Sequence, residues 1–230
     1  MTDLPYIKAN YLELRDELAD IAARVGVKAP TLVAVTKSGT DEELCELVRS
    51  GAVNIGENRP QELRRRADIL CGLGYSPILH EIGTLQRNKV KLIIKDVALI
   101  HSLDSVRLAD EIEKQAAAIG RRVPVLIEIN SAKEENKSGV MPDEAEALLC
   151  EVMKREHLLV QGLMTMGPAG CEEGELRGYF RETKKLFDRF ADRYGFGAEP
   201  TLSMGMSDSY RIAIEEGSTL VRVGRRLFRK

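Results

Sequence analysis

The sequence has no apolar run long enough to cross a membrane, and it has little excess charge of either sign. Its 34 Lys and Arg residues nearly balance 36 Asp and Glu residues, so the net charge is −2. This balance gives no reason to expect nucleic acid or an anionic membrane as a partner. The N-terminus, MTDLPYIKANYLELRDEL, is charged and helix-like and lacks the pattern of a signal peptide.

Cysteines are few and scattered. They are Cys45, Cys71, Cys150 and Cys171, and they form neither a CxxC pair nor a Cys/His spacing typical of a metal site. Thiols of this kind are usually reduced in the cytoplasm. We therefore expect a cytoplasmic protein without a metal site.

Short apolar runs alternate with longer amphipathic stretches along the 230 residues. The runs at 32–36 and 124–129 are rich in Val, Ile and Leu, as strands buried on both faces should be. In all, strands are predicted at 32–36, 52–55, 78–82, 97–101, 124–129, 158–163, 200–203 and 219–223.

Helical patterns lie between these strands. They predict helices over 4–25, 41–50, 105–119, 142–155 and 173–194. Thr40 and Glu43 form a capping box before the second of these helices, and Pro142 favours the start of the fourth. Repeated strand–helix alternation without a linker predicts a single α/β domain over residues 1–230. It is a (β/α)8 TIM barrel with an extra N-terminal helix. An open doubly wound sheet is the alternative.

In a TIM barrel the chemistry takes place at the C-terminal ends of the strands, and a phosphate often binds after strands seven and eight. Lys37 directly follows the first strand, in LVAVTKSG. The segment 203–209 (SMGMSDS) follows the seventh, and Arg222 and Gly224 lie in and after the eighth. Helix starts bind anions, and a glycine lets the backbone approach a ligand. Together these features indicate a phosphorylated aldehyde held by Lys37 as a Schiff base, a description that pyridoxal 5′-phosphate (PLP) fits.

The same residues also have structural interpretations. Lys37 can be a solvated residue after a strand, and the loop at 203–209 can be a plain turn. Arg222 can form an ion pair with Glu128 inside the barrel.

Other charged and polar residues also have purely structural interpretations. His80 and His101 are interpreted as core histidines with satisfied hydrogen bonds, and His157 as a surface residue. The basic cluster Arg64–Arg66 is interpreted as a solvated helix face.

Eight segments resemble the pyridoxal phosphate homeostasis proteins, the YggS or PROSC family. Their barrel is similar to the N-terminal domain of alanine racemase, the fold-type III architecture of PLP proteins. The segments keep the family order, and the pieces IGEN, IGTLQRNK, LSMGMSDS and GSTLVRVG are specific in combination. They are LVAVTK (32–37), NIGENRPQEL (54–63), HEIGTLQRNK (80–89), IHSLD (100–104), KSGV (137–140), GLMTM (162–166), LSMGMSDSY (202–210) and EGSTLVRVG (216–224).

The resemblance implies a cofactor site in which Lys37 holds PLP as an internal aldimine. The residues that it places around PLP are Lys37, Asn58, His80, Met164, Ser203, Ser207, Arg222, Gly224 and Arg225. Ser203 or Ser207, with the N–H groups after strand eight, would surround the phosphate, and the choice between the two serines stays open. Arg222 would face the pyridine nitrogen, where a fixed positive charge disfavours ring protonation and aminotransferase chemistry.

Several positions depart from the family pattern, among them Arg225 and Glu81. Arg225 stands where a hydroxyl residue, commonly Thr, is usual, so a hydroxyl contact to the phosphate is lost although the N–H remains. Glu81 stands where Phe is frequent. Both departures concern the fine geometry of the site.

Two functions are compatible with this site. The resemblance implies a carrier that buffers PLP and maintains vitamin B6 homeostasis without robust turnover, with PLP-dependent apo-enzymes as recipients. The alternative is a PLP-dependent amino-acid racemase. Racemisation in both directions needs a base on each face of the ring, whereas Lys37 supplies one face. Alanine racemase adds a C-terminal domain and a tyrosine from its dimer partner, while this sequence ends shortly after strand eight, which favours a monomeric carrier.

Overall fold

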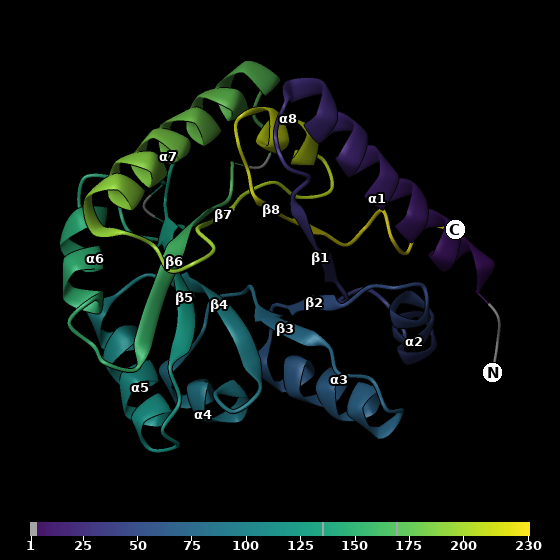
Figure 1. The fold of residues 1–230 in the computed structure, drawn as a ribbon, viewed down its shortest axis with the longest axis horizontal. Coiled ribbons are helices and arrows are strands. Elements are labelled where there is room, and N and C mark those ends of the chain that lie inside the picture. The colour runs from purple at the N-terminus through teal and green to yellow at the C-terminus, as the bar shows by residue number, and fades with distance from the viewer. Residues whose placement is uncertain (1–3, 135, 169) are drawn as a thin grey trace.

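The computed structural model describes residues 4–134, 136–168 and 170–230. Its centre is a closed barrel of parallel strands in the order β1 to β8, and helices surround it (Figure 1). The barrel closes where β1 pairs with β8, from Thr31 opposite Leu220 to Ala34 opposite Val223. This closure confirms the TIM barrel and excludes the open sheet. The strands are β1 (Thr31–Val35), β2 (Asn54–Glu57), β3 (Ile78–Glu81), β4 (Val97–Leu103), β5 (Val123–Ile129), β6 (Leu158–Thr165), β7 (Thr201–Ser203) and β8 (Leu220–Val223).

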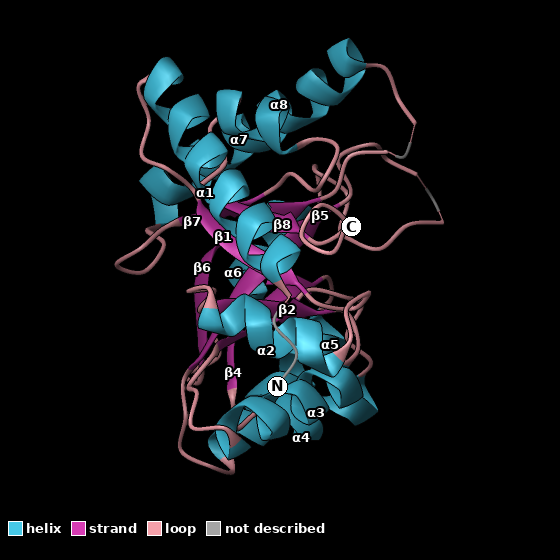
Figure 2. Cartoon of the chain, turned by 90° about the vertical axis from the view of Figure 1, so that its right-hand side faces the viewer, coloured by secondary structure: helices cyan, strands magenta, loops and turns pink. Residues whose placement is uncertain are grey.

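In the side view of Figure 2, helices lie above and below the strands, and loops extend at the right. The predicted capping box is present: Thr40 Oγ1 accepts from the Glu43 N–H at 3.2 Å, and Glu43 Oε2 accepts from the Thr40 N–H at 2.7 Å. One predicted start is wrong, because 142–144 form a turn and the helix begins at Ala145. The helices are α1 (Pro5–Val25), α2 (Asp41–Arg49), α3 (Pro60–Gly72), α4 (Val90–Ile93), α5 (Val106–Ala117), α6 (Ala145–Val152), α7 (Glu173–Tyr194) and α8 (Tyr210–Glu215), with a 3-10 turn η1 (Arg87–Lys89) before α4.

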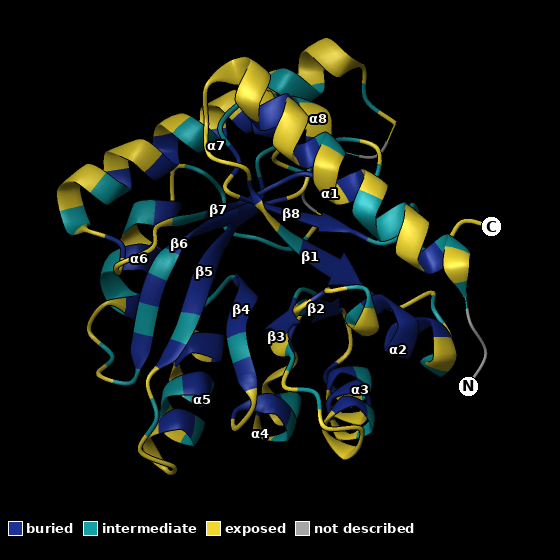
Figure 3. Cartoon of the chain, turned by 45° about the vertical axis from the view of Figure 1, so that its right-hand side comes forward, coloured by how far each residue is buried: buried dark blue, intermediate teal, exposed yellow. Residues whose placement is uncertain are grey.

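Two apolar clusters hold the barrel together. The larger lies between strands and helices, whose inward faces are buried and outward faces exposed (Figure 3). The smaller fills the barrel interior and consists of Val33, Leu99, Leu126, Met164 and Leu220. Two residues nearer the C-terminal ends of β4, β5 and β8, the corresponding positions are polar: His101, Glu128 and Arg222. The barrel thus has an apolar floor beneath a polar layer at the end where TIM barrels place their sites.

The C-terminal tail runs beside α1. The Asn10 side-chain amide donates to the carbonyls of Leu227 and Arg229, with N···O distances of 3.2 and 2.7 Å. These bonds anchor the segment that follows β8 to the outer layer. Among the described residues, no helix combines the length and the apolar character that crossing a membrane requires.

Candidate functional site

Lys37 occupies a tight turn directly after β1. The turn is closed by a hydrogen bond of 3.0 Å from the Gly39 N–H to the Thr36 carbonyl. The Lys37 side chain is exposed. A cavity of about 350 Å³ lies beside it, lined by Lys37, Ser38, Glu57, Asn58, Arg59 and Glu62. Lys37 and Asn58, both predicted site residues, therefore share one hollow at the ends of β1 and β2.

Glycine is required where the loop after β3 passes this hollow. A Cβ on Gly83 would lie 2.3 Å from the Asn58 carbonyl oxygen and 2.7 Å from its Cα, which no real side chain tolerates. The backbone of β3's loop thus packs directly on the residue after β2. This contact gives a physical reason for the glycine of the IGTLQRNK segment.

Arg222 is buried inside the barrel, with 3% of its surface exposed. Its Nη1 donates to the Ser203 hydroxyl, and its Nη2 donates to the Thr165 carbonyl at 3.0 Å. Burial lowers the pKa of Arg222 to about 10, and the charge of Glu128 opposes that shift. Glu128 is thus an electrostatic neighbour of Arg222. The direct contacts of the guanidinium are with β6 and β7.

A chain of hydrogen bonds continues from Arg222 across the barrel. A guanidinium only donates, so the Ser203 oxygen accepts from Arg222, and the same hydroxyl lies 2.9 Å from His101 Nδ1. His101 Nε2–H then donates to His80 Nδ1 at 3.0 Å. His80 Nε2–H in turn donates to Asn54 Oδ1 at 3.0 Å. Asn54 Oδ1 only accepts, and each neutral ring carries one proton, so this end of the chain sets both histidine tautomers and Ser203 donates to His101 Nδ1.

The charge state of the two histidines agrees with this chain. Burial lowers the pKa of His80 to about 4. It lowers the pKa of His101 well below its ordinary value, with smaller contributions from His80 and Arg222. Both rings are therefore neutral near pH 7. They are core histidines with satisfied hydrogen bonds, and His80 reaches Arg222 only through His101 and Ser203.

The two serines at the end of β7 and in the loop after it differ in their surroundings. Ser203 is fully buried and bound to Arg222 and His101. Ser207 is half-buried in the loop beyond β7, and its oxygen lies 3.4 Å from the Gly224 nitrogen, a long hydrogen bond. The Ser207 hydroxyl and the Gly224 N–H thus lie side by side where the loops after β7 and β8 meet.

Gly224 packs against the first strand. A Cβ on Gly224 would lie 2.8 Å from the Val35 carbonyl oxygen and 3.2 Å from the Val35 Cβ. The loop after β8 therefore touches β1 two residues before Lys37. Arg225, the next residue, is exposed and pairs with exposed Asp208. A pair of this kind contributes little to stability.

The remaining predicted site residue, Met164, lies in the apolar floor and is fully buried. Met166, two residues on, is 40% exposed at the end of β6. Within the described ranges, no three His, Cys, Asp or Glu side chains are grouped so as to hold a metal ion.

The interpretation of Arg64–Arg66 as a solvated face is wrong for Arg66. Its side chain is 5% exposed, whereas that of Arg65 is 44% exposed. The sequence carried a signal for this difference, because Arg66 lies three residues after Leu63 and four before Leu70, on the buried face of α3. The Arg66 guanidinium reaches the turn that carries Lys37.

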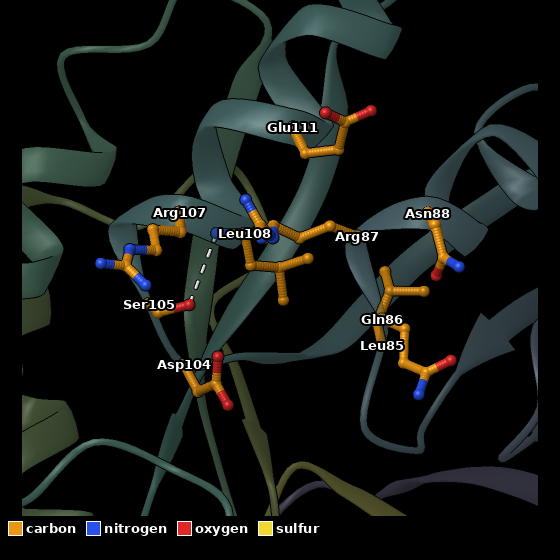
Figure 4. A pocket seen from close by; sticks show the side chains of 9 residues that line it. All are labelled: Leu85, Gln86, Arg87, Asn88, Asp104, Ser105, Arg107, Leu108 and Glu111. Carbon is orange, nitrogen blue, oxygen red and sulfur yellow. Dashed lines mark hydrogen bonds between the residues drawn. The ribbon is translucent and has the colours of Figure 1, made fainter.

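Figure 4 shows a second hollow, of about 700 Å³, between residues 85–88 and the start of α5. The Ser105 hydroxyl there accepts from the Leu108 N–H at 3.4 Å and caps the helix. Side chains of both charges line it, namely Arg87, Arg107, Asp104 and Glu111. It lies beyond β3 and β4, apart from the hollow beside Lys37.

The sequence matches the family of the alanine racemase N-terminal domain over residues 3–229. It is 40% identical over 203 residues to the pyridoxal phosphate homeostasis protein of Aquifex aeolicus, covering 88% of each chain.

Solved structures that resemble the fold include two with informative names. PipY of Synechococcus elongatus PCC7942, solved with PLP bound, superimposes with a TM-score of 0.84 at 27% identity and covers 97% of this chain and 100% of its own. Alanine racemase from Corynebacterium glutamicum gives a TM-score of 0.74 at 19% identity, covering 98% of this chain and 61% of that one. The second likeness concerns the barrel fold alone.

Proposed function

The chain belongs to the pyridoxal phosphate homeostasis protein family, and we propose that it binds PLP and carries and buffers this cofactor. One observation carries the proposal. The loop after β8 packs through Gly224 against Val35, two residues before Lys37. An exposed primary amine and a glycine-lined loop therefore open on the same end of the barrel, as a phosphorylated aldehyde requires.

The residues present fit the phosphate of PLP. The Gly224 N–H and the Ser207 hydroxyl are joined only by a long bond of 3.4 Å, so both can turn to a stronger anionic acceptor. No side chain on Gly224 stands between the backbone and such a ligand. Ser203 is bound to Arg222 and His101 instead, so we assign the phosphate to Ser207, Gly224 and the N–H of Arg225.

Arg222 suits a neutral ring nitrogen. A guanidinium has five N–H donors, and those donating to Ser203 and Thr165 leave others for a further acceptor. Its positive charge opposes protonation of a nearby nitrogen. We propose that Arg222 holds the pyridine nitrogen unprotonated, while Asn58 lines the pocket and Met164 forms its floor. Bound PLP then supplies a reactive aldehyde but a weak electron sink.

The covalent step uses Lys37. Its uncharged amine attacks the aldehyde carbon, a C=N bond forms and one water leaves, with no change in oxidation state. We propose that this Schiff base holds the cofactor until another amine takes it, and that apo-enzymes needing PLP are the recipients. A monomeric, cytoplasmic, single-domain protein accords with this role. The curated relative in Aquifex aeolicus bears a homeostasis name, which favours the carrier over the racemase.

Reconstitution with PLP tests the proposal. The wild-type protein should acquire the absorption band of a Schiff base, whereas Lys37→Ala should not. The variant should keep its free energy of unfolding within about 0.5 kcal/mol, because an exposed residue after a strand adds little packing. Lys133→Ala, which removes another exposed lysine, is the matched control and should retain the band. A wild-type protein that cannot take up PLP would refute the proposal.

Deuterium exchange at the Cα of amino acids separates the carrier from the racemase. We expect no enzymatic exchange with L- or D-amino acids. Exchange that turns over many times per protein molecule and requires Lys37 would favour the racemase.

A further inference from the structure

Arg66 on α3 holds the backbone of the turn that carries Lys37. Its Nη2 donates to the Gly39 carbonyl at 2.6 Å and lies 3.5 Å from the Thr36 carbonyl. These two carbonyls flank Lys37 on either side. A single guanidinium thus contacts both ends of the turn.

Two carboxylates hold this guanidinium in place. Arg66 Nη1 is hydrogen-bonded to Asp41, at the start of α2, and Arg66 Nε lies 3.7 Å from Glu57 Oε1. That same Glu57 oxygen accepts from the Thr36 hydroxyl at 2.5 Å. Thr36 is therefore held through its carbonyl by Arg66 and through its hydroxyl by Glu57.

Burying these charged groups lowers the stability of the fold. Among the described residues, neither Arg66 Nε nor Glu57 Oε2 has a hydrogen-bond partner, although both are buried. Burial raises the pKa of Glu57, against the Thr36 hydrogen bond and the charge of Arg66. Apolar side chains of similar volume often stabilise a core as well as a buried ion pair does. Apolar side chains, however, cannot donate hydrogen bonds to two backbone carbonyls as Arg66 does.

The C-terminal tail also contacts the turn. The Phe228 ring, from the tail after β8, packs on Gly39 so closely that a Cβ there would lie 2.4 Å from its Cε1. The turn thus has contacts with both α3 and the C-terminal tail. The side chains of Lys37 and its neighbour Ser38 are the parts of the turn left exposed.

We propose that Arg66 is a positioning residue for Lys37, acting with Glu57 through the carbonyls and hydroxyl of the turn. This role rests on the proposed function, in which the Lys37 amine must reach the aldehyde of a cofactor whose phosphate and ring are bound by residues of other strands. Small misplacements of a reacting group lower the reaction rate, so the hydrogen bonds from Arg66 to the turn determine how fast the Lys37 amine reacts with the aldehyde. Arg66 itself does not contact PLP.

Two variants test the proposal. Arg66→Ala removes these hydrogen bonds, and Arg65→Ala is the matched control, since Arg65 also pairs with Asp41 but, in the described part of the chain, makes no bond to the turn. The first readout is the rate at which the Schiff-base band appears after PLP is added. The second is the rate of Lys37 acylation in the apo-protein, measured by peptide mass spectrometry relative to the other lysines.

We expect Arg66→Ala to slow Schiff-base formation by about tenfold or more, while Arg65→Ala matches the wild type. The relative acylation rate of Lys37 should change only in Arg66→Ala. Arg66→Lys, which keeps a donor for the Gly39 carbonyl, should recover part of the rate. Wild-type rates in a folded Arg66→Ala protein would overturn the proposal.

Two further outcomes are informative. If Arg66→Ala does not fold, Thr36→Val provides the same test, since it removes the bond to Glu57 and keeps the side-chain shape. An unchanged rate in that variant counts against the proposal. If the wild type itself forms no Schiff base, the proposed function fails, whereas the acylation comparison of Arg66→Ala still decides whether Arg66 positions the turn.

Discussion

Glu81 should make the stability of the barrel depend on pH in a defined direction. Its carboxyl is fully buried at the end of β3, where Oε1 accepts from the Gly83 N–H at 3.3 Å. Oε2 has no partner among the described residues. Burial raises the pKa of Glu81 from 4.5 to about 8, the Gly83 hydrogen bond opposes the shift, and the charge of Glu57 adds to it. Glu81 is therefore protonated in the folded protein near pH 7.

The raised pKa means that stability falls as pH rises. Below pH 4.5 the carboxyl is protonated in both states, and its contribution to stability is fully present. Between pH 4.5 and about 8 the unfolded chain loses this proton and the folded protein keeps it. Each pH unit in this window costs about 1.4 kcal/mol of unfolding free energy. Above pH 8 both states are ionised and the dependence levels off.

Glu81→Gln keeps the shape and the acceptor but removes the titration. From pH 5 to pH 7 the unfolding free energy of the wild type should fall by about 2–3 kcal/mol more than that of the variant. Urea unfolding at several pH values measures this difference directly. Glu182→Gln, the same change at an exposed site on α7, should follow the wild type. Parallel curves for the wild type and Glu81→Gln would refute the reasoning.

Two further predictions concern the proposed phosphate contacts. Gly224→Ala should lower PLP affinity by about tenfold or more and reduce the melting temperature, because its methyl group meets backbone at 2.8 Å; Gly72→Ala, with no atom within 4 Å, should do neither. Ser207→Ala should weaken PLP binding with little loss of stability, whereas Ser203→Ala should cost about 1–3 kcal/mol of unfolding free energy by leaving buried groups unpaired. Titration with PLP and thermal melts check both, and a reversed pattern for the two serines would mean that the phosphate lies on Ser203.

Much of the fold could be predicted from the sequence, because strand and helix periodicities are local. The strand predicted at 78–82 lies at Ile78–Glu81, and the helix predicted at 173–194 lies at Glu173–Tyr194. The strand at 52–55 was misplaced by two residues, since β2 extends to buried Glu57. A pattern of apolar residues does not predict a buried carboxylate within a strand. The contacts with Thr36 and Arg66 explain why Glu57 lies in β2.

The site was harder to predict than the fold. Lys37 and Gly224 are predicted as site residues because each follows a predicted strand. In a TIM barrel the C-terminal ends of all strands lie on the same face, so the two residues are expected on that face. The roles of the two serines did not follow, because four residues of spacing say nothing about which hydroxyl points inward. An interpretation that treats the charged run as a unit does not find Arg66, because the three arginines of that run lie on different faces of α3.

The central claim is that Lys37 alone among the lysines holds PLP covalently. Borohydride reduction of the PLP-loaded protein, followed by peptide mass spectrometry, tests it most directly. The account predicts a single stoichiometric pyridoxyl adduct on Lys37, and none on that peptide in Lys37→Ala. Adducts spread over other lysines, or a loaded wild-type protein whose Lys37 remains unmodified, would contradict it.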